Sequence, residues 1–241
     1  MTRSKTEDIT EILRDEILKG QYRAGERLPS ERDLASRFES NRGAIREAIK
    51  KLEQLGIVQV NPGGVRVIAI EDATLEVLGH LLDLEEFPKP ALVEQSLDVS
   101  AALTGLSART AVERADADQR AEILEVIQRL QHQEIEDETY HEGWVELRNC
   151  FNKVNNNLVL RLIGNGLKNQ FVGRLQNAGI RALIDLERDR EFLKELEEAM
   201  NERDGEKAVR AITHHHQLIK QAILKALNQE GAILNLRSAN A

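Results

Sequence analysis

The distribution of proline is the feature of this sequence that most limits its fold. All four prolines lie in the first 90 residues, at positions 29, 62, 88 and 90. Because proline lacks a backbone N–H and disrupts helices, the proline-free segment that follows can form long uninterrupted helices. This segment is rich in Leu, Ala, Glu, Lys, Arg and Gln, which favour helix. We therefore predict a first domain that contains turns and a second, all-helical domain, with the boundary near residues 70–90.

The formal charge changes at the same boundary. Residues 1–70 hold 13 Lys/Arg and 11 Asp/Glu, a net charge of +2, whereas residues 71–241 hold 20 and 30, a net charge of −10. The overall charge of −8 argues against a nucleic-acid coat protein and against a polybasic membrane binder. It is compatible with a local basic patch in the first domain.

The sequence also indicates the compartment. The chain has one cysteine, Cys150, which cannot form an internal disulfide, and this is typical of a reducing compartment. The first residues lack the apolar core of a secretory signal, and no stretch reaches the roughly 18 apolar residues of a membrane span. We therefore expect a cytoplasmic protein with no membrane partner.

Three helices are predicted in the first domain, residues 1–70. Apolar spacing predicts a helix over residues 6–19, and Ser30, with Asp33 three residues later, is placed to cap a second. The third helix is expected over residues 42–54, with Asn41 near its start. Its apolar residues face inward, and its basic residues recur every four positions on the other side: Arg42, Arg46 and Lys50.

The period of the pattern changes to two after residue 56, which predicts a β-hairpin with its turn at Asn61-Pro62-Gly63-Gly64. Three helices followed by a hairpin form a winged helix-turn-helix, whose third helix enters the major groove of double-stranded DNA. Gly43 is small and leaves room in the first turn of that helix. The bare backbone of Gly63 and Gly64 can approach phosphate. The alternative for the basic stripe alone is a solvated helix face.

Residues 10–68 resemble the DNA-binding domain of the GntR family of bacterial regulators. The resemblance rests on Gly25-Glu-Arg-Leu-Pro-Ser-Glu-Arg-Asp-Leu-Ala, on Asn41-Arg-Gly-Ala-Ile-Arg-Glu-Ala-Ile-Lys-Lys-Leu, and on the glycine-rich hairpin turn. It implies DNA contacts from Arg32, from Asn41, Arg42 and Arg46, and from Gly63. Arginine suits this role because it can pair bidentately with guanine or clamp phosphate. Pro62 departs from the family, where many members have a basic residue or histidine.

The second domain, residues 91–230, is predicted to be a bundle of six or seven helices. Amphipathic segments cover residues 91–114, 117–137, 141–155, 157–177, 179–203 and 206–229. We expect residues 71–90 to couple the two domains and residues 231–241 to form a tail. The bundle resembles the effector domain of the FadR branch of the GntR family, on residues 146–151, Leu162-Ile-Gly-Asn-Gly-Leu-Lys and Ala208-Val-Arg-Ala-Ile.

Many members of this branch hold a divalent metal through Asp-x-x-x-His on one helix and one histidine on each of two later helices. Two ligands at i and i+4 share a helix face, and imidazole suits zinc or nickel. Here Arg148 stands at the Asp position, Asn152 at the first His position, and a residue near Leu193 at the second; only His215 survives. An arginine places a positive charge where a cation would bind, so we predict no metal and no cofactor.

Two interpretations of the histidine run at residues 214–216 remain open. In one, a single histidine is buried and two are at the surface. In the other, His215, Arg148 and Asn152 line an effector pocket and contact an anion. The Arg109-Thr-Ala step resembles the acyl-CoA sensor of the branch, so Arg109 is a further candidate for effector binding.

Together these features predict a homodimeric, ligand-responsive transcription regulator on a pseudo-palindromic operator. The effector is expected to be an acyl-CoA, or alternatively a small carboxylate or sugar acid, with or without metal. A ligand-independent DNA-binding protein is another alternative. An enzyme is not expected, because Cys150 has no histidine within four residues and the metal pattern is broken.

Overall fold

The computed structural model describes residues 4–84, 89–132, 137–177, 180 and 184–238. The chain divides into two compact units, Met1–Glu86 and Phe87–Ala241, and each has a hydrophobic core of its own. Within the described ranges, no helix is both long and apolar enough to cross a membrane.

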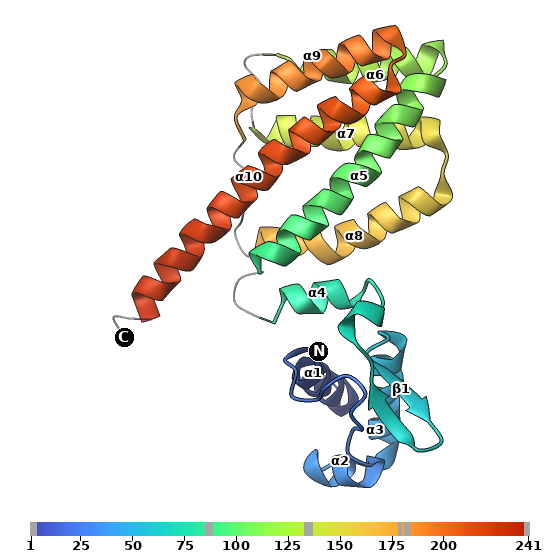
Figure 1. Ribbon diagram of the computed structural model, residues 1–241, viewed down its shortest axis with the longest axis vertical. Coiled ribbons are helices and arrows are strands. Elements are labelled where there is room, and N and C mark those ends of the chain that lie inside the picture. The colour runs from blue at the N-terminus through green and yellow to red at the C-terminus, as the bar shows by residue number, and fades with distance from the viewer. Residues whose placement is uncertain (1–3, 85–88, 133–136, 178–179, 181–183, 239–241) are drawn as a thin grey trace. The chain divides into compact units, whose positions relative to one another are not determined.

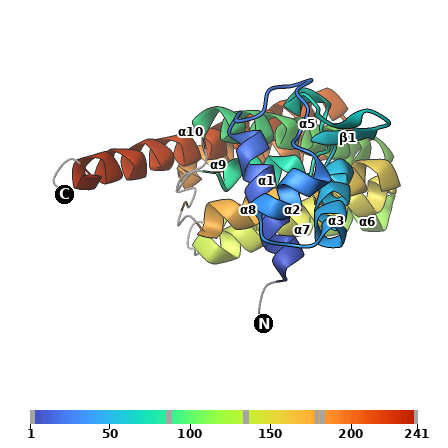
Figure 2. The ribbon, with the colours of Figure 1, turned by 90° about the horizontal axis from the view of Figure 1, so that it is seen from below.

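The first unit contains four α-helices, a 3-10 turn and a two-stranded hairpin (Figures 1 and 2). In chain order they are α1 (Lys5–Leu18), α2 (Glu31–Arg37), α3 (Arg42–Gln54), β1 (Val58–Asn61), β2 (Gly64–Val67), η1 (Ile70–Asp72) and α4 (Val77–Leu82). This arrangement confirms the predicted winged helix-turn-helix. The unit extends through α4, which lies within the segment that was expected to couple the two domains.

Side-chain caps fix where the first three helices begin. The Ser4 hydroxyl accepts from the Glu7 amide, the Ser30 hydroxyl from the Asp33 amide, and the Asn41 side chain from the Ala44 amide. Each cap satisfies one of the backbone donors that a helix start leaves free, a contribution of about 1 kcal/mol. The core between the helices is formed by fully buried aliphatic side chains, among them Ile9, Leu13, Leu34, Ile45, Leu52 and Ile57.

The hairpin is antiparallel and pairs Val58 with Val67 and Asn61 with Gly64. Val58 and Val67 are buried, so one face of the hairpin closes the core of the unit. Side chains alternate between the faces of a strand, so Gln59 and its partner Arg66 point to the other, exposed face. The two residues between the strands, Pro62 and Gly63, are exposed.

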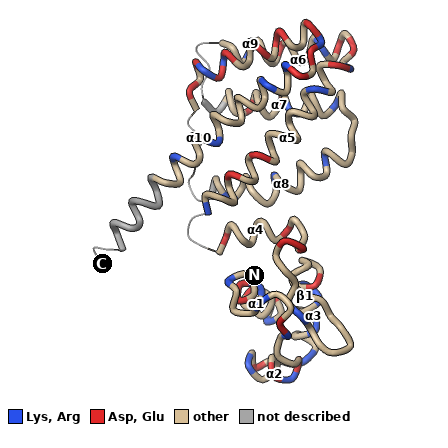
Figure 3. Tube along the Cα trace, viewed as in Figure 1, with Lys and Arg blue, Asp and Glu red and all other residues tan. Residues whose placement is uncertain are grey.

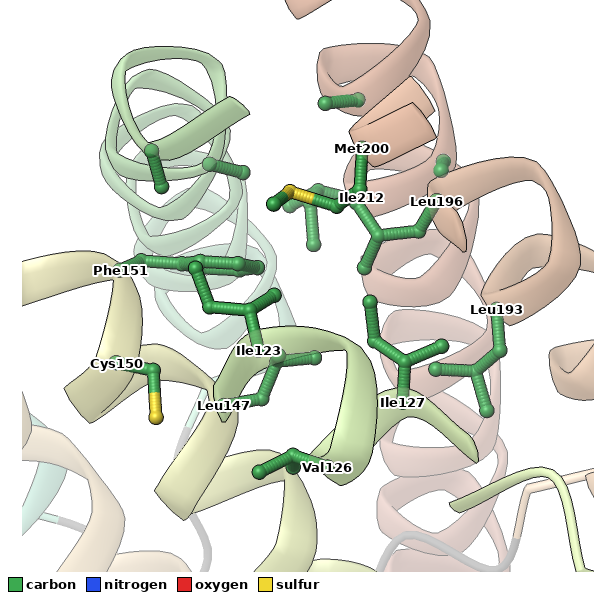
Figure 4. Close-up of a cluster of buried hydrophobic side chains, with 14 of the residues drawn as sticks. Ile123, Val126, Ile127, Leu147, Cys150, Phe151, Leu193, Leu196, Met200 and Ile212 are labelled. Carbon is green, nitrogen blue, oxygen red and sulfur yellow. The ribbon is translucent and has the colours of Figure 1, made fainter. Parts of the chain in front are cut away.

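The second unit consists of helices. They are α5 (Pro90–Arg114), α6 (Ala117–Leu130), α7 (Asp137–Asn155), α8 (Leu158–Asn177), α9 (Leu186–Glu202) and α10 (Gly205–Ser238). α10 packs against α5 and α9, and α7 packs against α5 and α6. Figure 4 shows the core that results, in which Phe151 and Leu147 of α7 meet Ile123 of α6 and Ile212 of α10.

Helix boundaries differ from the sequence prediction at several places. α6 ends at Leu130 rather than at 137, and α9 begins at Leu186 rather than at 179, because the Asp185 side chain caps it. Part of the predicted 179–203 helix lies outside the described residues. α10 runs on to Ser238 and extends beyond its neighbours (Figures 1 and 2), so residues 231–238 of the expected tail are helical.

Charge is unevenly distributed over the second unit (Figure 3). α9 carries seven acidic and three basic residues. α8, in contrast, carries three basic residues, Arg161, Lys168 and Arg174, and no acidic residue. The acidic excess that the sequence places after residue 70 is therefore absent from α8.

Candidate DNA-binding surface and buried polar cluster

The start of α3 is shaped by a side-chain cap. Oδ1 of Asn41 accepts a hydrogen bond from the Ala44 amide at 2.9 Å. A Cβ atom at Gly43 would lie only 3.0 Å from that oxygen, so glycine at this position leaves the cap undisturbed. The first turn of α3 therefore presents a smooth backbone, with Arg42 as its first exposed cation. Such a turn can come close to the floor of a groove.

The three basic residues predicted on α3 are all exposed. Nε of Arg46 lies 2.8 Å from Oε2 of Glu31, at the start of α2, and Nζ of Lys50 lies 2.8 Å from Oε1 of Glu47. Arg42 makes no ion pair with any residue that the structure describes. The Glu31 contact holds Arg46 against α2, so the side chain is oriented before it meets a ligand.

Arg32 projects from α2, and its side chain is 79% exposed. Its Nε lies 3.8 Å from Oδ1 of Asp33. The Ser30 hydroxyl donates to Asp33 and lowers the pKa of that carboxyl. The Asp33 carboxylate is thus held by the capping residue Ser30, and its loose contact with Arg32 leaves that side chain able to turn outward.

The turn of the hairpin requires glycine at one position. Gly64 has φ +116°, a conformation that residues with a side chain rarely adopt. Gly63 has an ordinary φ, but no atom lies within 4 Å of where its Cβ would be, so its backbone is open to solvent. The first unit thus carries all seven predicted DNA-contacting residues at exposed or partly exposed positions of α2, α3 and the hairpin.

A buried carboxylate organises the interior of the helical unit. Asp189 of α9 is fully buried, and it accepts hydrogen bonds from the Tyr140 hydroxyl and from Nε1 of Trp144, 3.2 Å away. Nδ1 of His215 lies 2.8 Å from Oδ1 of Asp189, and its ring stacks on Trp144 with centroids 3.5 Å apart. Burying a charge is costly unless several donors satisfy it, and here donors from α7 and α10 do so. Burial, with the Asp189 charge, raises the pKa of Tyr140, so its hydroxyl stays a donor.

Arg148 lies one turn beyond Trp144 on the same face of α7. Burial lowers the pKa of its guanidinium, and no carboxylate or carbonyl in the described chain accepts a hydrogen bond from it. The next turn carries Asn152, whose Oδ1 accepts from the Ser107 hydroxyl of α5 at 3.2 Å. A desolvated cation is therefore placed next to an amide and a hydroxyl inside the bundle.

The histidine run corrects one interpretation of the sequence. His215 and His216 are both buried, at 3% and 6% exposure, and only His214 is partly exposed. Two are buried rather than one because α10 is covered by α5 and by α9. Nδ1 of His216 donates to the Ile212 carbonyl at 3.0 Å. Burial, followed by electrostatic repulsion from His215, lowers the pKa of His216 to about 3, so its ring is neutral.

Arg109 lies apart from this cluster. It follows Ser107 by two residues, about 200° around α5, and it is exposed. Its guanidinium is paired with Glu113 at 3.0 Å and with Glu206 at 2.9 Å, and these contacts raise its pKa. Arg109 therefore already has two carboxylate partners, whereas Arg148 has none among the residues that the structure describes.

Comparison with known families identifies the chain. The model described as "Bacterial regulatory proteins, gntR family" matches residues 5–67, and that of the FCD domain matches residues 95–218. The chain belongs to the GntR family. The two matched regions fall within the winged unit and the helical unit respectively.

Individual relatives of this GntR member match in part. An uncharacterized HTH-type transcriptional regulator of Mycobacterium tuberculosis is 32% identical over 134 residues, 51% of this chain and 51% of that protein. The repressor NanR of Enterobacter is 33% identical over 82 residues, 34% of this chain and 31% of the relative. The chain thus spans about half or less of these curated relatives. They are transcriptional regulators and not enzymes, which confirms that prediction.

A solved structure covers more of the chain. A GntR family regulator from Pseudomonas syringae is 21% identical and covers 95% of this chain and 88% of its own, with a TM-score of 0.49.

Sequence reasoning found the exposed residues of the GntR winged unit but missed the centre of the FCD cluster. Tyr140, Trp144 and Asp189 carry no motif, and Asp189 lies in a helix full of other acidic residues. One signal could have found the face they share: Tyr140, Trp144, Arg148 and Asn152 recur every four residues along α7.

Proposed function

We propose that this GntR family member is a transcription regulator that acts in the cytoplasm by binding a specific operator in double-stranded DNA. The observation that carries this proposal is the start of α3, where Asn41, Arg42 and Arg46 surround a glycine-lined first turn with a hairpin beside it in sequence. Arginine at such a turn pairs with guanine or clamps phosphate. Arg32, Gly63 and Gly64 would add contacts to the backbone.

The test is a titration with a duplex that the wild-type protein selects from a randomised library. Arg42→Ala and Arg46→Ala should each weaken selected-site binding by about 1–3 kcal/mol at fixed salt. Lys153→Ala is the matched control, because it removes one exposed cation from the helical unit, where Lys153 pairs with Glu122. If both arginine variants bind as tightly as the control, α3 does not read DNA.

We further propose that the regulator is a homodimer and that its operator is pseudo-palindromic. α8 has an apolar face made by Leu158, Val159, Leu162 and Ile163, which are 45–65% exposed. Contiguous apolar surface of this kind is typical of protein interfaces. The domain as a whole is acidic, so two copies repel each other, but α8 carries no acidic residue. A second copy of the chain is therefore the partner that we assign to this face.

Light scattering on size-fractionated protein tests the dimer. Wild-type protein should have the mass of two chains, and Leu162→Glu should lower it toward one. Ile12→Glu, at an exposed apolar position of α1, should leave the mass unchanged. A wild-type monomer would contradict the dimer itself, whereas a Leu162→Glu dimer would contradict only the role of α8.

For the effector, we propose an organic anion with a carboxylate that Arg148 binds inside the helical unit. A desolvated guanidinium without an acceptor gains from a carboxylate, which it can hold bidentately. Asn152 and Ser107 add an amide and a hydroxyl beside it. In this proposal His215 positions the site through Asp189 and Trp144, and the exposed, paired Arg109 lies outside it.

A small carboxylate or sugar acid fits the single, half-buried cation of Arg148 better than an acyl-CoA, whose phosphates call for several cations. The FadR branch, with its acyl-CoA sensor, remains the alternative for this chain. A metal-assisted site is a further alternative, although no three metal-ligating side chains gather in the described parts of the chain.

A thermal-shift panel of hydroxy acids, sugar acids and acyl-CoAs distinguishes these cases. A ligand at about 100 times its Kd should stabilise the helical unit by about 2.7 kcal/mol. Arg148→Gln should abolish this response. Arg120→Gln, which changes a partly exposed arginine that donates to Asn201, should retain it. A response only to acyl-CoA favours the FadR alternative, and no response with intact operator binding favours a ligand-independent regulator.

A further inference from the structure

An isolated β-bridge, which the sequence pattern does not reveal, joins the hairpin of the winged unit to an earlier segment of the chain. The segment 25–28 runs beside β2: the Gly25 amide donates to the Val67 carbonyl at 2.8 Å, and the Leu28 amide donates to the Val65 carbonyl at 2.9 Å. Arg27 is thereby paired with Arg66. This segment precedes α2, so Arg27, 34 positions before Asn61, becomes part of the wing.

The Arg27 side chain lies across the turn of the hairpin. A Cβ atom at Gly64 would stand 2.7 Å from Nη2 and 2.8 Å from Cζ of Arg27, closer than real Cβ atoms approach. Glycine at position 64 therefore serves two purposes: it adopts φ +116°, and it makes room for the guanidinium. The turn itself, Asn61-Pro62-Gly63-Gly64, contains no cation, so Arg27 is the cation that reaches it.

The charge on this face is positive and is not neutralised. Arg27 makes no ion pair with any residue that the structure describes, and Arg66 donates to the Gly25 carbonyl at 2.8 Å instead of to a carboxylate. Two acidic side chains of the flanking segments contact backbone amides and not these arginines: Glu26 accepts from the Arg23 amide, and Glu53 accepts from the Val60 amide. Like charges on directly opposed residues of neighbouring strands destabilise a sheet, so an external anion would relieve this pair.

We propose that Arg27 and Arg66 form a phosphate-binding face of the wing, which binds the DNA backbone beside the groove that α3 enters. This inference rests on the proposed operator binding and adds a contact outside the recognition helix. A backbone contact carries no base information, so it adds affinity for any duplex and fixes the register of the wing. Both residues are exposed and need no rearrangement of the fold to reach a phosphate.

Arg27→Ala tests the inference through its salt dependence. Dissociation constants are measured at several salt concentrations on a selected duplex and on an unrelated duplex. Each phosphate contact contributes about −0.9 to the slope of log K against log salt, so Arg27→Ala should make the slope shallower by about that amount. Affinity should fall by a similar factor, about 5- to 20-fold, on both duplexes. Arg27→Lys, which keeps the charge, should retain most of the slope.

Arg23→Ala is the matched control, because Arg23 is an exposed arginine four residues earlier in the same segment. Circular dichroism checks that all variants keep their helices. If Arg27→Ala and Arg23→Ala have the same slope and affinity, the phosphate face is wrong. If Arg42→Ala no longer binds the selected duplex in the same experiments, the proposal of operator binding stands without the phosphate-binding face. A wild-type protein that binds neither duplex at low salt overturns both proposals.

Discussion

Acid should destabilise the helical unit through His216. This imidazole is 6% exposed, and burial, with the neighbouring charges of His215 and Arg148, lowers its pKa to about 3. The Ile212 carbonyl and the Asp189 charge oppose the shift but do not cancel it. In the unfolded chain the pKa returns to about 6.5, so unfolding takes up a proton at any pH between the two values. The stability that the neutral His216 contributes is therefore constant above about pH 7.5 and is lost as the pH falls below 6.5.

The size of the effect follows from the two pKa values. At pH 5 the unfolded state gains about RT ln(1 + 10^1.5), or about 2 kcal/mol, and at pH 6 it gains about 0.8 kcal/mol. His216→Asn keeps a side-chain donor for the Ile212 carbonyl but cannot take up a proton. This variant should be less stable at every pH, because the side chain is smaller, yet its loss between pH 8 and pH 5 should be about 2 kcal/mol less than that of the wild type.

Trp144 makes the measurement specific to the helical unit. It is the one tryptophan of the chain and it stacks on His215, so its fluorescence reports the unfolding of this unit alone. Urea titrations at pH 5, 6, 7 and 8 give the free energies. His132→Asn, at an exposed position after α6, is the control and should follow the wild type. If His216→Asn loses as much free energy between pH 8 and pH 5 as the wild type, the buried neutral His216 is not the cause.

Three further predictions concern other buried or capping groups. Asp189→Asn replaces one acceptor oxygen of the buried cluster with a donor, so it should lower the free energy of unfolding by about 2–4 kcal/mol in the same Trp144 assay. The control Glu187→Gln, at an exposed position of α9, should change this free energy by less than about 0.5 kcal/mol. Cys150 is buried with its pKa raised to about 11, so it should react with a thiol reagent only after denaturation; rapid reaction of native protein would contradict its placement. Asn41→Ala and Ser4→Ala each remove a helix cap, so each should lower the free energy of unfolding by about 1 kcal/mol in thermal melting. Only Asn41→Ala should also weaken operator binding in the duplex titration.

Much of the winged unit could be predicted because its determinants are local. Ser30 and Asn41 mark helix starts by their own hydrogen bonds, and the Asn61-Pro62-Gly63-Gly64 turn sets the hairpin register without help from distant residues. The third helix was predicted at its observed bounds, residues 42–54. The β-bridge between Arg27 and Arg66 was missed because it exists only by pairing with β2, and no periodicity within four residues can indicate that.

The interior of the helical unit could be predicted only in outline. The spacing of apolar residues located the helical segments. Which polar residue is buried, however, depends on how α7, α9 and α10 pack together. Asp189 looks like any other acidic residue of α9 until α7 supplies Tyr140 and Trp144, and α10 supplies His215. The number of buried histidines in residues 214–216 was predicted wrongly for the same reason. α10 is covered by α5 and α9, and a helix covered on two sides buries two of three consecutive side chains.

Arg27 and Arg148 share a property that links the two units. The chain has 41 acidic and 33 basic residues, so carboxylate partners are abundant, and yet neither arginine has one among the described residues. At Arg27 the opposed Arg66, and at Arg148 the desolvation of the guanidinium, favour an anion from outside: phosphate at the exposed wing, and a carboxylate ligand in the bundle. The two roles are separable, because each unit has its own core. Arg148→Gln should therefore leave the salt slope of DNA binding unchanged, and Arg27→Ala should leave the thermal response to ligand unchanged. A variant of either residue that alters both measurements would show that these arginines do not act as separate anion sites.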